Sequence, residues 1–541
     1  MTRSSSVGRA AWLAALLAGV ASPLAAQSGW HPPGGPIIDT IVIVSHNIFD
    51  RQERVLGFMA RLADAIHVRT RPLVIRRTLL LNQGDPYDSA RAVESERALR
   101  ALGVFRQVVI DTERVRGLLA LRVETFDGWS TKPQVNWSTE GGDVSWVVGM
   151  EEDNLVGTAT SLSALYSTDV DRSAVSLLYQ NPHFIWRRPR LFGLYQDLSD
   201  GQRGSWALSM PFYETAAPWA LGTGGEAATQ RILEFRDGAL LDSIERHALR
   251  FGVGGGVALH ATTRDYLRLW GGASWRREDF APESTTAVPY SSFGTVGAGI
   301  ELSHTRYVIM QHFNTYARRE DENLSETLRV GLWAAPAAWG YPSGEAGIGA
   351  ELSGQVTTIW SGGFAVLRGG TDGVLTSSGL DSARIRGGFT IASQNFAAQT
   401  IVLHVEGGIL RHPKPGGQFD SYLDQTGPRL FAAHAFTGTR TVWVCLEDRV
   451  LVSEQVAGLI GVGLAPFFDW GGDWYDARDL VAVQQVLGET PRTGSDVGLA
   501  IRLGPTRSVE ADVEEIDIGW RFGNGYYGSS LALSIRRAIF F

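Results

Sequence analysis

The sequence contains almost no cysteine, since Cys445 is the only one in 541 residues. A disulfide framework and a cysteine-built zinc or iron–sulfur site within the chain are therefore excluded. The sequence also lacks a basic surplus: 49 Lys and Arg stand against 57 Asp and Glu, which gives a formal charge of −8. A chain of this charge offers no electrostatic footprint for nucleic acid, so we expect no nucleic-acid partner.

Long apolar runs are missing beyond the N-terminus. The longest, at 456–468, has 13 residues and contains Pro466, whereas a membrane-spanning helix needs about 20 apolar residues. The sequence thus excludes a helical membrane protein but allows a closed β-barrel, the other structure that can span a bilayer. No Gly-x-Ser-x-Gly, His-Glu-x-x-His or Gly-x-x-x-x-Gly-Lys motif occurs. We therefore predict no enzyme, no catalytic residue, no cofactor and no metal site.

Residues 1–26 have the pattern of a cleaved secretion signal. Arg3 and Arg9 provide the positive start, 10–21 are apolar, and Leu24-Ala25-Ala26 form a small-residue cleavage site. Residues 27–36 follow as a linker, because they are rich in proline and glycine.

Residues 37–127 predict a small α/β domain with the order β-α-α-β-β. After the turn at 83–86, Asp88 or Ser89 caps a clear amphipathic helix, and Gly103 lies just past its end. The other expected elements are strands at 38–44, 104–110 and 118–124 and a compact apolar segment at 73–81. An additional helical pattern at 55–66 lies in an insertion after the first strand. Such a domain has one exposed sheet edge.

Residues 130–541 lose the helical period and alternate instead with a period of two. The clearest segments are 249–260, 295–303, 346–353, 496–503 and 516–523. One face of each segment is apolar, and the other is glycine, small polar or charged. A soluble β-sandwich also alternates, but its outward face is rarely so rich in glycine. The pattern therefore favours a transmembrane antiparallel β-barrel, with its apolar face toward lipid.

Length and aromatic residues agree with a barrel. About 412 residues at roughly 20–30 per strand give about 14–20 strands. The aromatic residues expected in interfacial girdles at strand ends are Tyr266, Trp275, Trp443, Trp474 and Tyr475. The chain end has one apolar face as well, formed by Leu531, Leu533, Ile535, Ile539 and Phe541. A last strand that ends in an aromatic residue resembles the assembly signal of bacterial outer-membrane proteins, although any barrel has a closing strand.

A single small domain before a large barrel resembles the BamA/TamA outer-membrane protein family. In the domain, the turn and helix that resemble a polypeptide-transport-associated (POTRA) domain contain Gly84, Asp85, Tyr87, Glu94, Arg97 and Leu99. In the barrel, Asn154–Gly157 and Tyr179–Pro182 are similar to the opening hairpins of the family. The resemblance implies one POTRA-like domain in the periplasm and a barrel of about 16 strands in the bacterial outer membrane.

A third series, near the chain end, is similar to the lid-loop motif of the family. Alternation along the strands places Glu447 and Asp469 in the lumen. An arginine could bridge two such carboxylates, a geometry that lysine does not reproduce. The resemblance gives this role to Arg429, although Leu430 replaces the usual glycine after it and Arg440 is a rival for the role.

The resemblance implies a protein that assists insertion of polypeptides into the outer membrane or their translocation across it. Its partners would be outer-membrane lipid, unfolded polypeptides and periplasmic or lipoprotein partners. The alternative is a passive channel or structural barrel whose POTRA-like domain docks a periplasmic partner. Family members that act as general assembly factors usually carry several such domains, whereas this sequence shows one. The alternative therefore stays open.

Overall fold

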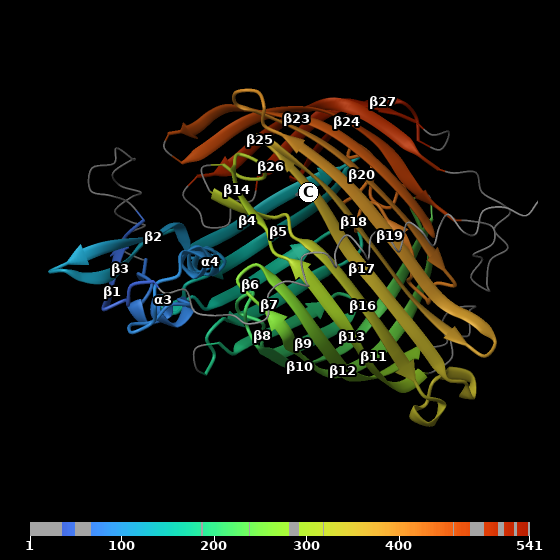
Figure 1. Ribbon diagram of the computed structural model, residues 1–541. Coiled ribbons are helices and arrows are strands. Elements are labelled where there is room, and N and C mark those ends of the chain that lie inside the picture. The colour runs from blue at the N-terminus through green and yellow to red at the C-terminus, as the bar shows by residue number, and fades with distance from the viewer. Residues whose placement is uncertain are drawn as a thin grey trace, which may run out of the picture.

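The computed structural model describes residues 35–48, 67–185, 188–236, 238–280, 291–316, 319–457, 459–475, 492–506, 513–523 and 527–538. They form a small α/β unit that lies against one end of a large barrel (Figure 1). We call this the domain end, and the other the far end. The predicted secretion signal and the expected helix at 55–66 lie outside the described residues.

The small unit has the predicted order of elements. They are β1 (Thr40–His46), α3 (Pro72–Thr78), α4 (Ser89–Arg100), β2 (Phe105–Val115) and β3 (Leu118–Asp127). The sheet order is β1-β3-β2, with β1 parallel and β2 antiparallel to β3. Both outer strands therefore keep a free edge within the described residues. None of the helices described is long and apolar enough to cross a membrane.

Local sequence explains where α4 begins and which face it buries. The Asp88 carboxylate accepts hydrogen bonds from the backbone N–H groups of Ala90 (2.8 Å) and Arg91 (3.3 Å), as an N-cap residue does. Leu99 is fully buried among the sheet residues. Gly103 adopts a φ of 70° just past the helix, where glycine is favoured.

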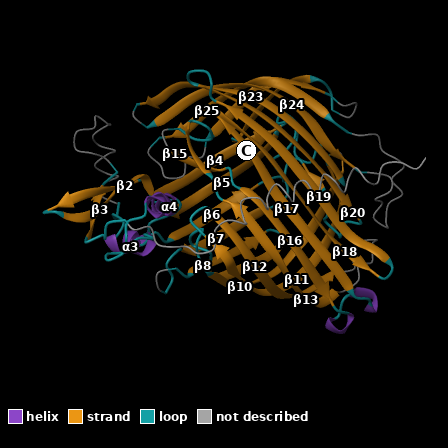
Figure 2. Cartoon of the chain, viewed as in Figure 1, coloured by secondary structure: helices purple, strands orange, loops and turns teal. Residues whose placement is uncertain are grey.

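Twenty antiparallel strands close the barrel (Figures 1 and 2). The strands are β4 (Thr131–Glu140), β5 (Asp143–Glu152), β6 (Ser161–Thr168), β7 (Ser173–Asn181), β8 (Arg190–Leu198), β9 (Gly201–Met210), β10 (Trp219–Arg236), β11 (Ala239–Ala261), β12 (Asp265–Phe280), β13 (Ser291–His304), β16 (Glu326–Ala335), β17 (Gly347–Trp360), β18 (Gly363–Thr376), β19 (Gly379–Ser393), β20 (Gln399–Arg411), β23 (Arg440–Val456), β24 (Ile460–Trp474), β25 (Gly494–Pro505), β26 (Glu514–Phe522) and β27 (Ser530–Arg537). Short 3-10 turns are η1 (Leu155–Gly157), η2 (Ala337–Trp339) and η3 (Pro342–Gly344).

The expected number of 16 strands is wrong. That number came from the family resemblance, whereas the estimate from chain length reached about 20 strands at its upper end. The first six strands, β4 to β9, have only eight to ten residues each and short connections. Short strands fit more crossings into the same length of chain.

The period of two in the sequence separates the two faces of the wall. On β11, Leu249, Phe251 and Val253 are 45%, 48% and 45% exposed on the outside. Three of the aromatic residues predicted for the outer girdle face inward instead, because strand parity rather than aromatic character decides the side. One of them is Tyr475, whose hydroxyl donates to Gln418 Oε1 at 2.9 Å. Trp443 is only 2% exposed, and the Tyr266 hydroxyl donates to Glu301 Oε1 at 2.6 Å inside the barrel.

Two segments fold into the barrel from opposite ends. From the far end comes the lid loop, residues 412–439 between β20 and β23, which contains β21 (Phe419–Asp420) and β22 (Thr437–Gly438). From the domain end comes the inner hairpin, residues 305–325 between β13 and β16, which contains β14 (Tyr307–Gln311) and β15 (Arg319–Asn323). The sequence predicts the first of these segments but not the second.

Candidate functional site

Arg429 of the lid loop lies inside the barrel against two strands. Its Nε donates to Asp469 Oδ2 on β24 at 2.6 Å, and its Nη1 donates to Glu447 Oε1 on β23 at 2.8 Å. The side chains of all three are at most 1% exposed. The guanidinium also lies 4.1 Å from the ring centre of Phe467. The structure thus brings together the three residues that the sequence analysis grouped.

The arginine belongs to a larger buried network that the sequence analysis did not identify. We call it the lumen charge network, and its members are Arg429, Glu447, Arg449, Asp469, Asp496, Arg502, Glu515, Asp517 and Arg536. Arg536 Nε on β27 donates to Asp517 Oδ2 on β26 at 3.0 Å, and Arg502 Nη1 lies 3.1 Å from Glu515 Oε1. The inward parity of β25, β26 and β27 was the signal that could have found these residues.

Leu430, which replaces the usual glycine of the lid motif, has a defined place. Its side chain is fully buried and packs against Ala465, Phe467 and Ala500. Its backbone N–H donates to Asp496 Oδ2 at 2.8 Å. A Cβ at Gly519 would lie 2.9 Å from the Leu430 side chain. Small residues on the wall therefore make the space that this leucine needs.

Arg440, the rival arginine, lies at the start of β23. Its Nη1 donates to the backbone carbonyl oxygens of Leu410 at 3.0 Å and Thr439 at 3.2 Å. The two carboxylates predicted as partners are instead held by Arg429.

The lid loop also contacts the first hairpin of the barrel. The Ala433 N–H donates to Asp143 Oδ2 at 3.0 Å, and the Tyr422 hydroxyl lies 3.2 Å from Ser145 Oγ. Asp143 and Ser145 begin β5, next to β4. The loop therefore touches strands on both sides of the junction where β27 meets β4.

That junction, which we call the seam, is the weakest paired part of the wall. Within the described residues, β27 and β4 share one registered pair, Ile535 opposite Thr139. The next shortest ladder of the barrel, between β5 and β6, has seven pairs. Leu533 and Ile535 of the predicted assembly signal lie on the seam strand, with Leu533 46% exposed. Ile539 and Phe541 lie outside the described residues.

His434 fixes the lid loop at the far end. One ring nitrogen lies 2.6 Å from Asp420 Oδ2 and the other 2.9 Å from Asp171 Oδ1 in the β6–β7 connection. The ring stacks on Phe235 with centroids 3.6 Å apart. Burial alone would lower the pKa of His434, but the hydrogen bonds to Asp171 and Asp420 outweigh burial and raise it to about 9.

We expect the lid loop to loosen in mild alkali. Because the folded pKa of His434 lies above the unfolded value of 6.5, its stabilisation is complete below about pH 6.5 and disappears as the pH rises through about 9. The effect on the free energy of lid docking is on the order of 3 kcal/mol. Limited proteolysis of the loop at increasing pH measures it. His434→Gln should remove the step, whereas His304→Gln, at a half-exposed ion pair, should keep it. Equal cleavage across this pH range would contradict the assignment.

The first three residues of the predicted motif, Gly84, Asp85 and Tyr87, lie in the turn before α4. Gly84 adopts a φ of 89°, and its N–H donates to the Ile38 carbonyl at 2.8 Å, so the turn joins the start of the domain. Asp85 Oδ2 closes the turn by accepting from the Asn82 N–H at 2.8 Å. Tyr87 follows, and burial together with Asp111 raises the pKa of its hydroxyl.

Two helix residues of the motif, Glu94 and Arg97, face the barrel. Glu94 Oε1 accepts from the N–H and the hydroxyl of Thr215, in the β9–β10 connection, at 2.8 Å each. The Arg97 guanidinium lies 3.7 Å from the ring centre of Tyr307 on the inner hairpin. Arg100 binds both carboxylate oxygens of Asp321 at 2.7 and 2.8 Å. Glu94 and Arg97 are residues of the predicted motif, but their docking against the barrel does not follow from the sequence pattern.

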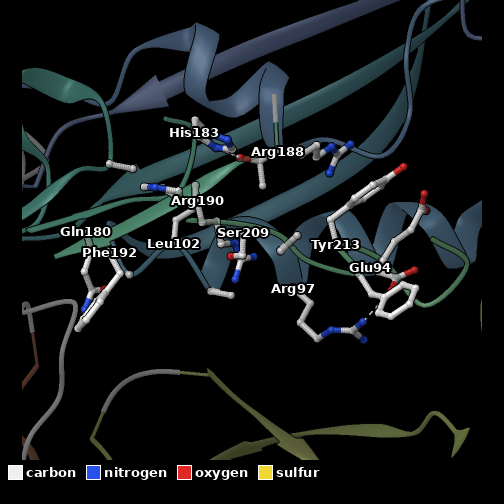
Figure 3. Close-up of a pocket in the computed structure, with 18 of the residues that line it drawn as sticks. Glu94, Arg97, Leu102, Gln180, His183, Arg188, Arg190, Phe192, Ser209 and Tyr213 are labelled. Atoms are coloured by element: carbon white, nitrogen blue, oxygen red, sulfur yellow. Dashed lines mark hydrogen bonds and ion pairs between the residues drawn. The ribbon is translucent and has the colours of Figure 1, made fainter. Parts of the chain in front are cut away.

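A polar cavity of about 840 Å³ opens between α4 and the inner wall of the barrel (Figure 3). Figure 3 shows Glu94 and Arg97 of the helix and, from the barrel, Arg188, Arg190 and Tyr213 around this space. Arg188 lies 3.9 Å from the ring centre of Tyr213. No group of three or more metal-ligating side chains occurs in the described part of the chain.

Part of the sequence is similar to a curated protein. It is 28% identical over 170 residues to outer membrane protein assembly factor BamA of Neorickettsia risticii, which covers 27% of this chain and 22% of that protein. The match therefore spans about a fifth of the length of that relative. No family model matches the chain.

Solved structures of two similar proteins were also found. CdiB from Escherichia coli gives a TM-score of 0.46 at 9% identity and covers 100% of this chain and 99% of that chain. BamA from Haemophilus ducreyi lacking POTRA domains 1–3 gives a TM-score of 0.38 at 12% identity and covers 92% and 84%. With that sequence match and a closed antiparallel barrel, the chain resembles the BamA/TamA outer-membrane proteins.

Proposed function

We propose that this protein helps other polypeptides to insert into the bacterial outer membrane, or to cross it, by opening its barrel at the seam. In this proposal residues 37–127 are a POTRA-like domain in the periplasm, and 130–541 are the membrane barrel. The domain end then faces the periplasm, and the far end faces the outside. The mechanism needs no catalytic group, because the substrate changes its environment and no covalent bond changes.

The observation that carries the proposal is the single registered pair between β27 and β4. In an antiparallel ladder every second pair exchanges two backbone hydrogen bonds, and each such bond stabilises by about 0.5–1.5 kcal/mol net. A seam with one pair therefore separates at much lower cost than the seven-pair ladder between β5 and β6. Opening would expose unpaired edges on two strands, which can template a new strand.

The lid loop supports the same proposal because it spans the seam. Arg429 and Leu430 bind β23, β24 and β25 on one side, and Ala433 binds Asp143 on the other. We propose that these contacts hold the barrel closed at rest. The buried ion pairs of Arg429 anchor the loop on one side of the seam, and the Ala433 hydrogen bond anchors it on the other.

The small domain offers a place to receive a substrate. Strand β1 pairs only with β3 in the described residues, so its outer edge can accept an extended polypeptide by strand addition. The proposed partners are unfolded polypeptides and, at the same domain, periplasmic or lipoprotein partners.

A passive channel is the second candidate, and the polar cavity at the domain end favours it. Reconstitution of the full chain in liposomes separates the two. We expect the folding of an added, unfolded outer-membrane barrel to accelerate at least about tenfold over protein-free liposomes, a change of about 1.4 kcal/mol in the barrier. Ion conductance without any acceleration would overturn the proposal and support the channel.

A further inference from the structure

The inner hairpin joins three parts of the protein that are distant in sequence. Its base contacts α4 of the small domain, its body packs on the barrel wall, and its tip reaches the strands next to the seam. We propose that this hairpin is an internal latch, which holds the seam closed while α4 is docked and weakens the seam when α4 leaves. The inference rests on the proposed opening at the seam and concerns its regulation.

The base of the hairpin carries the contacts with the domain. Arg100 of α4 binds Asp321 on β15 through two parallel hydrogen bonds of 2.7 and 2.8 Å. This bidentate geometry is among the strongest that side chains form, and it fixes direction as well as distance. Arg97 stacks on Tyr307 of β14 at 3.7 Å. Both strands of the hairpin are therefore held by one helix.

The body of the hairpin is well packed, so a change in its position at α4 also moves its tip. Met310, Phe313 and Leu324 are buried against the wall residues Phe364 and Val402. Glu320 is 5% exposed, and its carboxylate accepts from the backbone N–H groups of residues 313, 314 and 315 at 2.9–3.2 Å. The Glu320 carboxylate therefore fixes the backbone of residues 313–315.

The tip of the hairpin lies on the strands that lead to the seam. Tyr316 is 7% exposed and packs with Val513, before β26, and Ala538, directly after β27. Its ring packs directly against glycines of the wall. A Cβ added at Gly461 would lie 2.5 Å from the Tyr316 ring, and one added at Gly504 would lie 2.7 Å from it. Movement of this ring therefore changes the support of the closing strand β27.

The hairpin also touches the lumen charge network. Arg449 Nη1 donates to the backbone carbonyl oxygen of Phe313 at 2.7 Å, and Arg449 Nε donates to Glu447 Oε2 at 2.9 Å. Glu447 in turn accepts from Arg429 of the lid loop. Arg449 and Glu447 on β23 thus connect the latch to the lid, so both segments bear on the same closed state.

The test measures exposure of the seam without any substrate. A single reporter cysteine replaces Thr139, which is 9% exposed opposite Ile535, and a water-soluble maleimide labels it in detergent. The native Cys445 is fully buried and serves as the unreactive internal reference. We expect Asp321→Asn and Tyr316→Ala each to raise the labelling rate about tenfold, a typical size for coupling between sites. Gly461→Ala, which displaces the ring without altering Tyr316, should do the same.

The combination of variants identifies a latch. Because Asp321 and Tyr316 act through one hairpin, the double variant should label no faster than the faster single variant, whereas independent sites would multiply their effects. Tyr316→Phe keeps the ring, and Asp372→Asn breaks an exposed lumen pair with Arg384. Both should therefore label at the same rate as the reporter variant without a further substitution. Heat-dependent gel migration shows that each barrel is folded.

Two results would overturn the latch: unchanged labelling in the Asp321 and Tyr316 variants, or rates that multiply in the double variant. Failure of the proposed function gives a different result. If the labelling responds as expected while the full chain does not accelerate folding of an added barrel, the latch stands and the insertion function fails.

Discussion

Arg429→Ala should release the lid loop and lower the temperature at which the folded barrel converts to its unfolded form. Its guanidinium is fully buried and binds Asp469 and Glu447. Removal of one partner from a buried ion pair costs about 3–5 kcal/mol, because the remaining charges lose their compensation. Arg449, Arg502 and Arg536 remain nearby, so we expect an assembled but weakened barrel. Heat-dependent gel migration and protease cleavage of residues 412–439 measure the two effects.

Two further substitutions test whether the position of the charge matters. Arg429→Lys should restore only part of the heat resistance, because an ammonium group does not bind two carboxylates in one plane. Arg440→Ala should be milder, since the hydrogen bonds described for Arg440 go to the backbone carbonyls of Leu410 and Thr439. If Arg440→Ala is damaging and Arg429→Ala is silent, the lid motif has been aligned to the wrong arginine.

The inward direction of Glu447 and Asp469 could be predicted because it depends only on strand parity. The period of two along β23 and β24 places both carboxylates with Cys445 and Phe467, and the structure buries this face. The partners Asp496, Glu515 and Arg536 have the same inward parity on β25, β26 and β27, which pair with their neighbours in chain order. Their contacts with the lid loop depend on strand register and on the path of that loop, which the spacing of residues does not give.

The inner hairpin was not predictable for a different reason. Its strands have five residues each, and β15 reads Arg-Glu-Asp-Glu-Asn, a pattern that resembles a solvated loop. The buried contacts of Glu320 and Asp321 come from the hairpin turn and from α4, some 220 residues earlier in the chain. The local sequence therefore indicates exposure, and the tertiary contacts reverse it.

A disulfide across the seam should abolish substrate folding by this protein. Cysteines at Thr139 and Ile535 replace the one registered pair. Directly opposite residues in antiparallel strands have Cα atoms about 4.5–5.5 Å apart, within the range of about 4.4–6.8 Å that a disulfide spans. In the oxidised variant we expect almost complete loss of acceleration in the liposome assay, and recovery after reduction, because only the locked seam differs between the two states.

A matched pair of cysteines elsewhere in the wall distinguishes the effect of a locked seam from the effect of any disulfide in the barrel. Thr358 and Ala365 lie opposite each other in the long ladder between β17 and β18, so a disulfide there joins strands that never need to part. This variant should accelerate folding as well when oxidised as when reduced. The native Cys445 is fully buried and does not compete for either disulfide. If the locked seam still accelerates substrate folding, lateral opening is excluded, and polypeptides would have to pass through the lumen beside α4.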